Sequence, residues 1–456
     1  MNNNQDQAIL EGPLNKQIFR LAIPTMLGLM CQALYDIVDL LWIGMISSKA
    51  VAAMTVFSTY MWIIELFNEI VGAGSVSMIS QYHGEGNKEK TQLAAEQTMT
   101  FKFILATAGA LVMCLTLRPV LGFFSSDSEV VQLGLDYGFI RAAFLPIFFS
   151  SYSVNTIFRC TGNAKTPMIL LGIAAVMNII LDPLMMFETV PYIGIKGLGL
   201  GMKGAAWATV ISIGFSFIGG MAILLSGKAP ISIRVRKLFV LNPEIDRKLF
   251  KVGLPSGFTL AFRNIFNIYL MKLVASYGTE AIAYVGIASR LANFGMMPYS
   301  GIAMGGGVII GHCLGAGNEP RALEAAKHCK RICMIMVCIM ASVLILLPKQ
   351  LMSAFLGGTV PPVEGWSLLA IIGFSMILAS FGSGYYASFS GSGFMKPVFW
   401  SGFIAQYCVM LPFTLIAKLC GAPVIVIWLA YNLGDLTDTL VKRFSWKKMK
   451  WLSNRV

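Results

Sequence analysis

Charged side chains are scarce in this chain, and their scarcity excludes a soluble protein. Asp, Glu, Lys and Arg together make up 12% of the 456 residues, against about 25% in soluble domains. Hydrophobic residues make up 56%, and the mean hydropathy is +0.71. Apolar stretches of about 20 residues, each enough to cross a hydrocarbon core of about 30 Å, recur along the whole length. The alternating segments of about ten residues that a membrane β-barrel needs are missing.

The motifs of common enzymes are missing as well. There is no Walker A loop, which argues against ATP hydrolysis, and no Ser–His–acid pattern involves any of the three histidines. The nine cysteines lack metal-ligand spacing and are expected to be small packing residues. Gly84-x-Gly86-Asn87 and Gly315-x-Gly317-Asn318 look like phosphate loops, but at the ends of long helices they are better explained as glycine caps and tight turns. We therefore expect neither an enzyme nor a bound cofactor.

The apolar stretches predict an all-α integral membrane protein with twelve transmembrane helices. The polar first eleven residues contain no basic segment, so no cleaved signal peptide is expected. We place the helices at residues 17–45, 50–80, 93–117, 132–158, 166–187, 204–226, 248–275, 280–312, 326–348, 365–389, 397–417 and 423–442.

Basic residues are concentrated in the loops that follow even-numbered helices and at the termini, for example from Lys228 to Lys251 and from Lys442 to Arg455. The positive-inside rule therefore predicts a multi-pass protein of the plasma (inner) membrane with both termini in the cytoplasm. The net charge of +13 is explained by this one-sided placement. Nucleic-acid binding is consequently not expected.

Two long segments of the chain repeat each other. Residues 14–98 match residues 245–329 without a gap, every position shifted by 231, so that Pro24 corresponds to Pro255. The agreeing positions are prolines, glycines and helix-end asparagines, which fix backbone shape. Duplication in so apolar a chain is typical of secondary transporters.

The repeat divides the predicted protein into two six-helix bundles. Because each half begins and ends on the same side, the bundles should be related by a pseudo-two-fold axis along the membrane normal, with a cleft between them. The predicted divisions are an N-lobe of residues 1–226, a cytoplasmic linker of residues 227–246 and a C-lobe of residues 247–456.

Five carboxylates lie inside the predicted helices of the N-lobe. Because a charge at mid-bilayer costs several kcal/mol, ionisable residues inside membrane helices are expected to have a function or a specific partner. A cluster of this kind can hold a proton or a sodium ion and can attract an organic cation. The carboxylates are Asp36, Asp39, Glu65, Glu69 and Asp182.

The second half lacks these carboxylates. Leu270 corresponds to Asp39, and Leu411 stands where Asp182 would be expected. A coupling ion should therefore bind in the N-lobe only. The C-lobe offers Arg263 instead, within its first helix. These residues could also be purely structural, because a carboxylate can cap a neighbouring helix, Asp36 could face water, and Arg263 could neutralise one of the acids.

Over nearly its full length the chain resembles the multidrug and toxic compound extrusion (MATE) transporters. The Asn178-x-x-x-Asp182-Pro183 motif and the absence of glutamate at Arg263 are more similar to the DinF-type and archaeal branch than to the NorM branch. The resemblance is carried by Leu34-Tyr35-Asp36-Ile37-Val38-Asp39-Leu40-Leu41-Trp42-Ile43-Gly44, Phe158-Arg159-Cys160-Thr161-Gly162-Asn163-Ala164-Lys165-Thr166-Pro167, Asn178-Ile179-Ile180-Leu181-Asp182-Pro183 and Gly204-Ala205-Ala206-Trp207-Ala208-Thr209.

The resemblance implies a monomeric antiporter that exports amphipathic, often cationic compounds from a lipid bilayer by alternating access, in exchange for H+ or Na+. It also implies a bend in the first helix at Pro24. The cation-coupling residues are expected to be Asp39, Asn178, Asp182 and Thr209, which would be metal ligands only with Na+ coupling. The expected substrate-binding residues are Gln32, Tyr35, Asp36, Glu65, Glu69, Asn155 and Arg263. The resemblance implies Gln32, Tyr35 and Asn155, and the other four are included because they are charged residues within predicted helices.

The chain departs from the family pattern between Asp182 and Thr209, where about nine extra residues are expected around 188–196. Two alternative functions agree less well with the sequence. A lipid-linked saccharide flippase of the same superfamily would need an arginine-lined cavity, which the five carboxylates oppose. A receptor or sensor would need a soluble domain through which to signal.

Overall fold

The computed structural model describes residues 9–227, 229–238, 240–356 and 362–455, which form two compact units. One unit, called unit 2 here, contains residues 27–79 and 87–251. The other, unit 1, contains residues 1–26, 80–86 and 252–456. Helix α2 (Leu14–Ile46) changes unit between Met26 and Leu27, two residues after Pro24.

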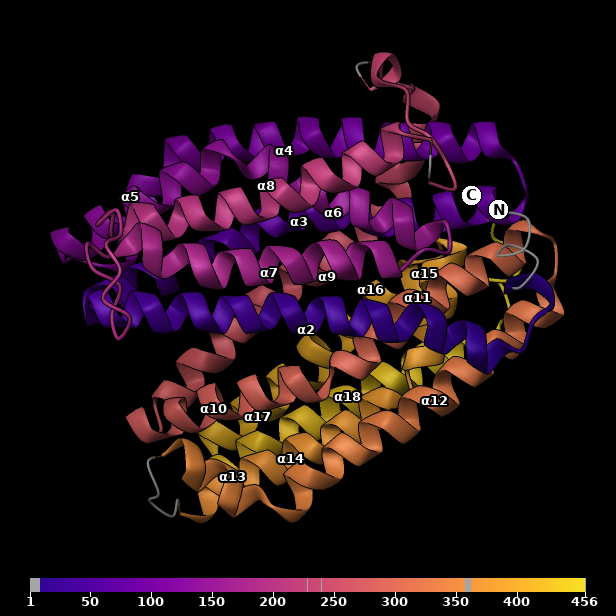
Figure 1. The fold of residues 1–456 in the computed structure, drawn as a ribbon. Helices are drawn as coiled ribbons and strands as arrows, with labels where there is room; N and C mark the ends of the chain where they lie inside the picture. Colours follow the sequence, from indigo (N-terminus) through magenta and orange to yellow (C-terminus); the bar gives the residue numbers. More distant parts are fainter. Residues whose placement is uncertain (1–8, 228, 239, 357–361, 456) are drawn as a thin grey trace. The chain divides into compact units, whose positions relative to one another are not determined.

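Unit 2 is a helical bundle in which α7 and α8 run side by side and α6 packs on α4 and α8 (Figure 1). The large side chains of Phe57, Tyr137 and Phe149 lie in its core and are at most 2% exposed. Its helices are most of α2, most of α3 (Ser48–Gly84), α4 (Lys88–Phe124), α5 (Ser128–Ala143), α6 (Leu145–Cys160), α7 (Lys165–Met186), α8 (Met202–Leu225) and the start of α9 (Pro243–Ala275), with a 3-10 turn at Val235–Lys237.

Unit 1 is also helical, with α11 packed on α12 and α15, and α14 packed on α12 and α18. Its helices are the rest of α9, α10 (Thr279–Gly295), α11 (Met297–Gly315), α12 (Glu319–Leu346), α13 (Pro348–Phe355), α14 (Val363–Ser380), α15 (Ser383–Ser392), α16 (Lys396–Phe403), a π-helix (Ile404–Met410), α17 (Leu411–Leu419) and α18 (Val424–Lys447).

The twelve predicted spans all coincide with helices, but several of them are not continuous. The 132–158 span is two helices bent by 52° at Phe144, and the 280–312 span is bent by 41° at Met296. Pro146 and Pro298 stand in the first turn of the second segment, where a missing N–H costs nothing. The spans predicted at 365–389 and 397–417 are likewise interrupted, the second by a π-helix.

Within the described residues, nine helices are long and apolar enough to cross a membrane, or up to eleven if each bent pair is one span. Helix α9 is not among them, although its 33 residues are long enough. Its interior carries Arg263, Asn264 and Asn267, which lower its hydropathy.

The two loop-like glycine motifs are helix turns, as predicted. Gly86 and Gly317 adopt φ of +76° and +74°, which only glycine tolerates without strain. Each is followed by an asparagine that begins the next helix: Asn87 caps α4 and Asn318 caps α12 through its side-chain oxygen.

Within unit 1 the ends of α3 and α11 cross with almost no space between their backbones. A Cβ atom on Gly84 would lie 2.2 Å from the carbonyl oxygen of His312, and one on Gly315 would lie 2.0 Å from that of Gln81. The shift of 231 relates Gly84 to Gly315 and Gln81 to His312, so the contact is reciprocal. Equivalent residues of the two repeats therefore make equivalent contacts where these two helix ends cross.

The linker predicted at residues 227–246 is partly bound to α4 within unit 2. Gln97, which is 1% exposed, donates to the carbonyl of Val240 (2.7 Å) and accepts from the N–H of Asn242 (2.9 Å). Two further bonds join Thr100 to Leu238 and Glu96 to Arg234.

The N-terminal segment is held in unit 1 in a related way. The guanidinium of Arg321 on α12 donates to the carbonyl of Ile9 (3.1 and 3.0 Å) and to that of Gly12. Ile9 and Val240 are related by the shift of 231.

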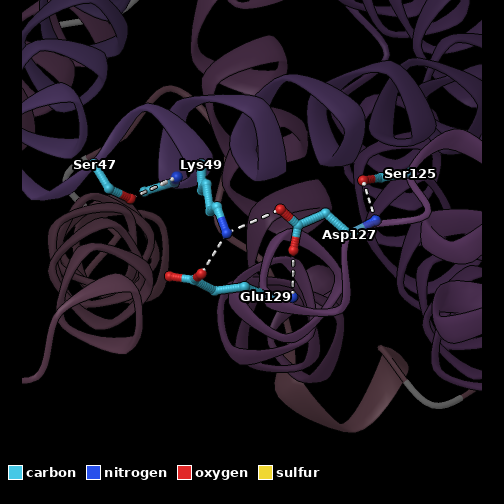
Figure 2. Close-up of polar contacts among 6 residues, drawn as sticks. Ser47, Lys49, Ser125, Asp127 and Glu129 are labelled. Atoms are coloured by element: carbon cyan, nitrogen blue, oxygen red, sulfur yellow. Dashed lines mark hydrogen bonds and ion pairs between the residues drawn. The ribbon is translucent and has the colours of Figure 1, made fainter.

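Two loops at one end of unit 2 are joined by an exposed ion cluster (Figure 2). Lys49 at the start of α3 lies 3.0 Å from the carboxylate of Asp127 and 2.6 Å from that of Glu129. The hydrogen bond from Lys49, followed by that from the backbone N–H of Glu129, lowers the pKa of Asp127. Asp127 also caps α5, so the cluster fixes the start of that helix.

Candidate functional site

The four predicted cation-coupling residues all lie in unit 2 and are all buried. Asp39 on α2 is 3% exposed, Asn178 and Asp182 on α7 are 1% and 0%, and Thr209 on α8 is 3%. The amide of Asn178 donates to Asp182 Oδ1 over 3.0 Å, as their spacing of four residues allows. The carboxylates of Asp39 and Asp182 interact electrostatically with each other. The Thr209 hydroxyl donates to the carbonyl of Ala205 (2.9 Å).

Three oxygen atoms of this group are buried without a hydrogen-bond partner: Asp39 Oδ1, Asn178 Oδ1 and Asp182 Oδ2. A buried acceptor that lacks a partner is costly, and such an atom needs an explanation. A proton or a hard cation such as Na+ would be a partner for these three oxygens, because carboxylate and carbonyl oxygens suit such ions. Among the described residues no group of three or more His, Cys, Asp or Glu could hold a metal ion. Two carboxylates and an amide oxygen are hard donors, which suit a small cation such as Na+ better than a soft transition metal.

The end of α7 that carries Asp182 is held by the residues that follow it. A helix normally leaves its last carbonyl groups without partners. Here the backbone N–H groups of residues 198–201 donate to the carbonyls of residues 184–187 over 2.8–3.0 Å. Gly199 and Gly201 have positive φ, which allows the returning chain to follow the helix end. The segment around residues 188–196, which the sequence analysis expected to be an addition to the family pattern, forms a hairpin closed by a β-bridge between Thr189 and Lys196.

A cation that the sequence analysis missed lies next to the carboxylates. Arg141 on α5 interacts electrostatically with Asp36 and Asp39. Its guanidinium carbon lies 3.9 Å from the ring centroid of Phe148 and 5.9 Å from that of Tyr137. Its Nε and Nη1 atoms are buried without an acceptor. Arg141 lies inside a predicted span, so the reasoning applied to the carboxylates would have found it.

A second missed cation faces the glutamates of α3. Lys102 on α4 is 2% exposed and interacts electrostatically with Glu69 and Glu65. A Cβ atom on Gly72 would lie 3.6 Å from the Lys102 ammonium. Positions 65, 69 and 72 share one face of a helix, so Lys102 lies against the face that carries both acids. Glu65 also accepts a hydrogen bond from Asn68 (3.3 Å).

The predicted substrate-binding residues are divided between the units. Gln32 donates to the hydroxyl of Tyr152 (2.8 Å), whereas Asp36 is exposed. Tyr35 and Asn155 are 8% and 7% exposed, and Asn155 Oδ1 has no partner. These residues and the two glutamates belong to unit 2, whereas Arg263 is exposed on the part of α9 in unit 1. Pro24 lies inside α2, in the part that belongs to unit 1.

The long apolar helices are those of a multi-pass membrane protein, and the buried carboxylate pair with unpartnered oxygens is its candidate ion site. A family model described as MatE matches residues 24–184 and 255–416, and the chain belongs to this family.

Relatives and solved structures agree with this family. The chain is 27% identical over 342 residues to Probable multidrug resistance protein YoeA of Bacillus subtilis, covering 73% of this chain and 72% of that protein. It is 24% identical over 364 residues to a FAD transporter of Shewanella oneidensis, covering 78% and 77%. Its fold is similar to that of a MOP superfamily transporter from Pyrococcus furiosus, with a TM-score of 0.87, 23% identity and 98% of each chain covered. The fold is thus the all-α, twelve-helix, two-bundle architecture predicted from the sequence.

Proposed function

We propose that this protein is a secondary active multidrug efflux antiporter that exports amphipathic, mainly cationic compounds in exchange for H+ or Na+. Membership of the MatE family supports transport, and relatives named for multidrug resistance support small drugs as substrates. The coupling ion would be the only accessory species, with no cofactor. Both termini would lie in the cytoplasm, and the chain would act as a monomer.

The observation that carries the proposal is the set of three buried oxygens without partners on Asp39, Asn178 and Asp182. A coupling ion, whether a proton or Na+, would satisfy them. A drug cation and the coupling ion could not both be held there cheaply, because the excess positive charge would lie in a medium of low dielectric constant. Such competition would couple the export of one to the import of the other.

The transport cycle would expose this site alternately to the two sides of the membrane. We place the moving lobes at residues 1–226 and 247–456, joined by the linker 227–246. Pro24 would be the hinge of α2, because proline removes one hydrogen bond of the helix. The division of α2 two residues after Pro24 supports this assignment.

The test is efflux of a fluorescent organic cation from proteoliposomes under separately imposed pH and sodium gradients. Asp39→Asn and Asp182→Asn should abolish gradient-driven efflux, because an amide does not titrate and carries no charge. The gradient that drives the wild-type protein identifies the ion. Leu270→Ala and Leu411→Ala, at the equivalent C-lobe positions, are the controls and should keep coupling. Normal rates in both aspartate variants, or loss of ion dependence in L270A alone, would contradict the single-site proposal.

A lipid-linked saccharide flippase is the alternative from a different functional class. Three cations of unit 2 favour it to the extent that they could contact an anionic group: Lys102, which is buried, and Arg141 and Arg159, whose Nε atoms are buried. The same proteoliposomes distinguish the two functions: an ion-driven flux of cationic dyes supports the antiporter. Tight binding of an anionic lipid-linked sugar without such a flux would instead support the flippase.

A further inference from the structure

The chain between α7 and α8 forms a hairpin beyond the end of α7 (Figure 1), and the side chains at its tip are apolar and exposed. Tyr192 is 90% exposed, Ile193 67%, Ile195 55% and Leu198 65%. Large apolar side chains in such a cluster are unfavourable in water. Val190, in contrast, is 2% exposed and fixes the base of the hairpin.

The backbone of the hairpin is rigidly defined. Val190 donates to Ile195 over 2.8 Å, Gly194 to Val190 over 2.9 Å, and Gly197 to Glu188 over 2.8 Å. The returning strand then bonds the carbonyls at the end of α7. The tip is therefore connected through a short, hydrogen-bonded path to the helix turn that carries Asp182.

Tyr192 adopts a backbone conformation that its side chain disfavours. Its φ is +67°, a left-handed value that costs a residue other than glycine roughly 1–2 kcal/mol. Glycine at this position would remove that cost. A strained residue that keeps a large side chain suggests that the side chain has a function.

The tip follows α7, which also exposes apolar side chains. On α7 the exposed apolar residues recur with helical spacing, at Ile169, Ile173, Val176 and Ile180. In a membrane-spanning helix such an exposed stripe faces lipid. A tyrosine with aliphatic neighbours and an adjacent lysine, Lys196, is the composition typical of the boundary between headgroups and acyl chains.

We propose that the hairpin tip, residues Tyr192 to Ile195, inserts into the headgroup–acyl boundary of the bilayer and anchors the end of α7. The occupant of this apolar surface is phospholipid rather than a partner protein. The predicted orientation of the chain places it in the outer leaflet. The anchor fixes the depth of the α7 end in the bilayer and does not depend on the identity of the exported compound.

The test uses p-benzoylphenylalanine, a photo-crosslinking amino acid, incorporated at position 192 of the full chain. The protein is reconstituted into phosphatidylethanolamine–phosphatidylglycerol vesicles, irradiated and analysed by mass spectrometry for phospholipid adducts. Position 180 on the lipid-facing stripe is the positive control. Position 235, in the linker and 51% exposed, is the control outside the predicted spans. Adducts at 192 should be within about threefold of those at 180 and about tenfold above those at 235.

A second measurement separates anchoring from mere proximity to lipid. With the probe at position 198, Ile193→Ser together with Ile195→Ser should reduce lipid adducts about threefold, while a probe at position 180 in the same background should be unaffected. Adducts at 192 as rare as at 235, crosslinks to protein in place of lipid, or no change at 198 would each overturn the proposal. Because no transport is measured, failure of the antiporter proposal would leave this result intact.

Discussion

At the residue scale, the important finding is that unit 2 contains buried cations as well as buried acids. The sequence drew attention to five carboxylates and predicted a cluster that could hold a proton or a sodium ion and attract an organic cation. The structure adds Lys102 beside Glu65 and Glu69, and Arg141 beside Asp36 and Asp39. Buried charges are normally paired, because an isolated charge in low dielectric is costly. The glutamates of α3 are therefore expected to contribute less to cation binding than their number suggests.

Lys102 provides a test of this charge balance. Lys102→Met should increase the affinity for divalent organic cations about tenfold, because one positive charge a few ångströms from the glutamates is removed. Binding of matched monovalent, divalent and neutral dyes to the purified protein measures the effect. Divalent dyes should gain more than monovalent dyes, and neutral dyes should be unaffected.

The matched control for Lys102→Met is the double variant with Glu69→Gln, which restores the charge balance and should return affinities to about the wild-type values. The double variant also protects against misfolding, since it leaves no unpaired acid at Glu69. Equal affinities of wild type and K102M across the dye series would mean that these residues lie outside the substrate path.

At the element scale, the crossing of α3 and α11 shows why glycines fix helix positions. Gly84 and Gly315 allow one backbone to touch another at distances that no Cβ atom permits. The same repeat position performs the same function in both helices. An insertion of one methyl group at either glycine must separate the two helix ends or bend one of them.

Gly84→Ala and Gly315→Ala should each destabilise the protein by about 3 kcal/mol or more, because the added Cβ meets backbone that cannot rotate away. Gly172→Ala in α7 is the control, since a Cβ there meets nothing within 4 Å. In that open helical setting, alanine should be neutral or stabilising by up to about 1 kcal/mol. Thermal unfolding of the purified variants measures all three. A G84A protein as stable as G172A would contradict the close crossing.

At the scale of the whole molecule, α2 belongs to both compact units, as α3 and α9 also do. Pro24 lies two residues before the point where α2 passes from unit 1 to unit 2. A helix is weakest where a proline removes a hydrogen bond. Motion of one unit against the other would therefore be concentrated near this residue.

Pro24→Ala should slow efflux about tenfold while leaving the affinity for the exported cation within about twofold of wild type. The rate should fall because the variant restores a helical hydrogen bond at the hinge. Efflux rates in proteoliposomes and equilibrium dye binding measure the two quantities. Pro119→Ala is the control, because Pro119 lies inside α4 within a single unit. An equal loss of rate in both variants would point to a general effect of proline on helix stability.

The sequence by itself determined the features that depend on local composition and spacing. Hydropathy placed all twelve spans, and the repeat predicted the two glycine turns that begin α4 and α12. The pairing of Asn178 with Asp182 followed from their separation of four residues. These features were predictable because neighbours along a helix are fixed in space by helix geometry alone.

Only the tertiary structure decided which residues from different helices meet. The burial of Asp39 with Asp182, the approach of Lys102 to Glu69 and the crossing of Gly84 over His312 join residues far apart in the chain. The bend at Phe144 and the hairpin that completes the end of α7 likewise depend on backbone geometry and hydrogen bonds beyond one helix turn. No periodicity encodes such contacts, because they depend on how side chains of different helices fit together at close packing.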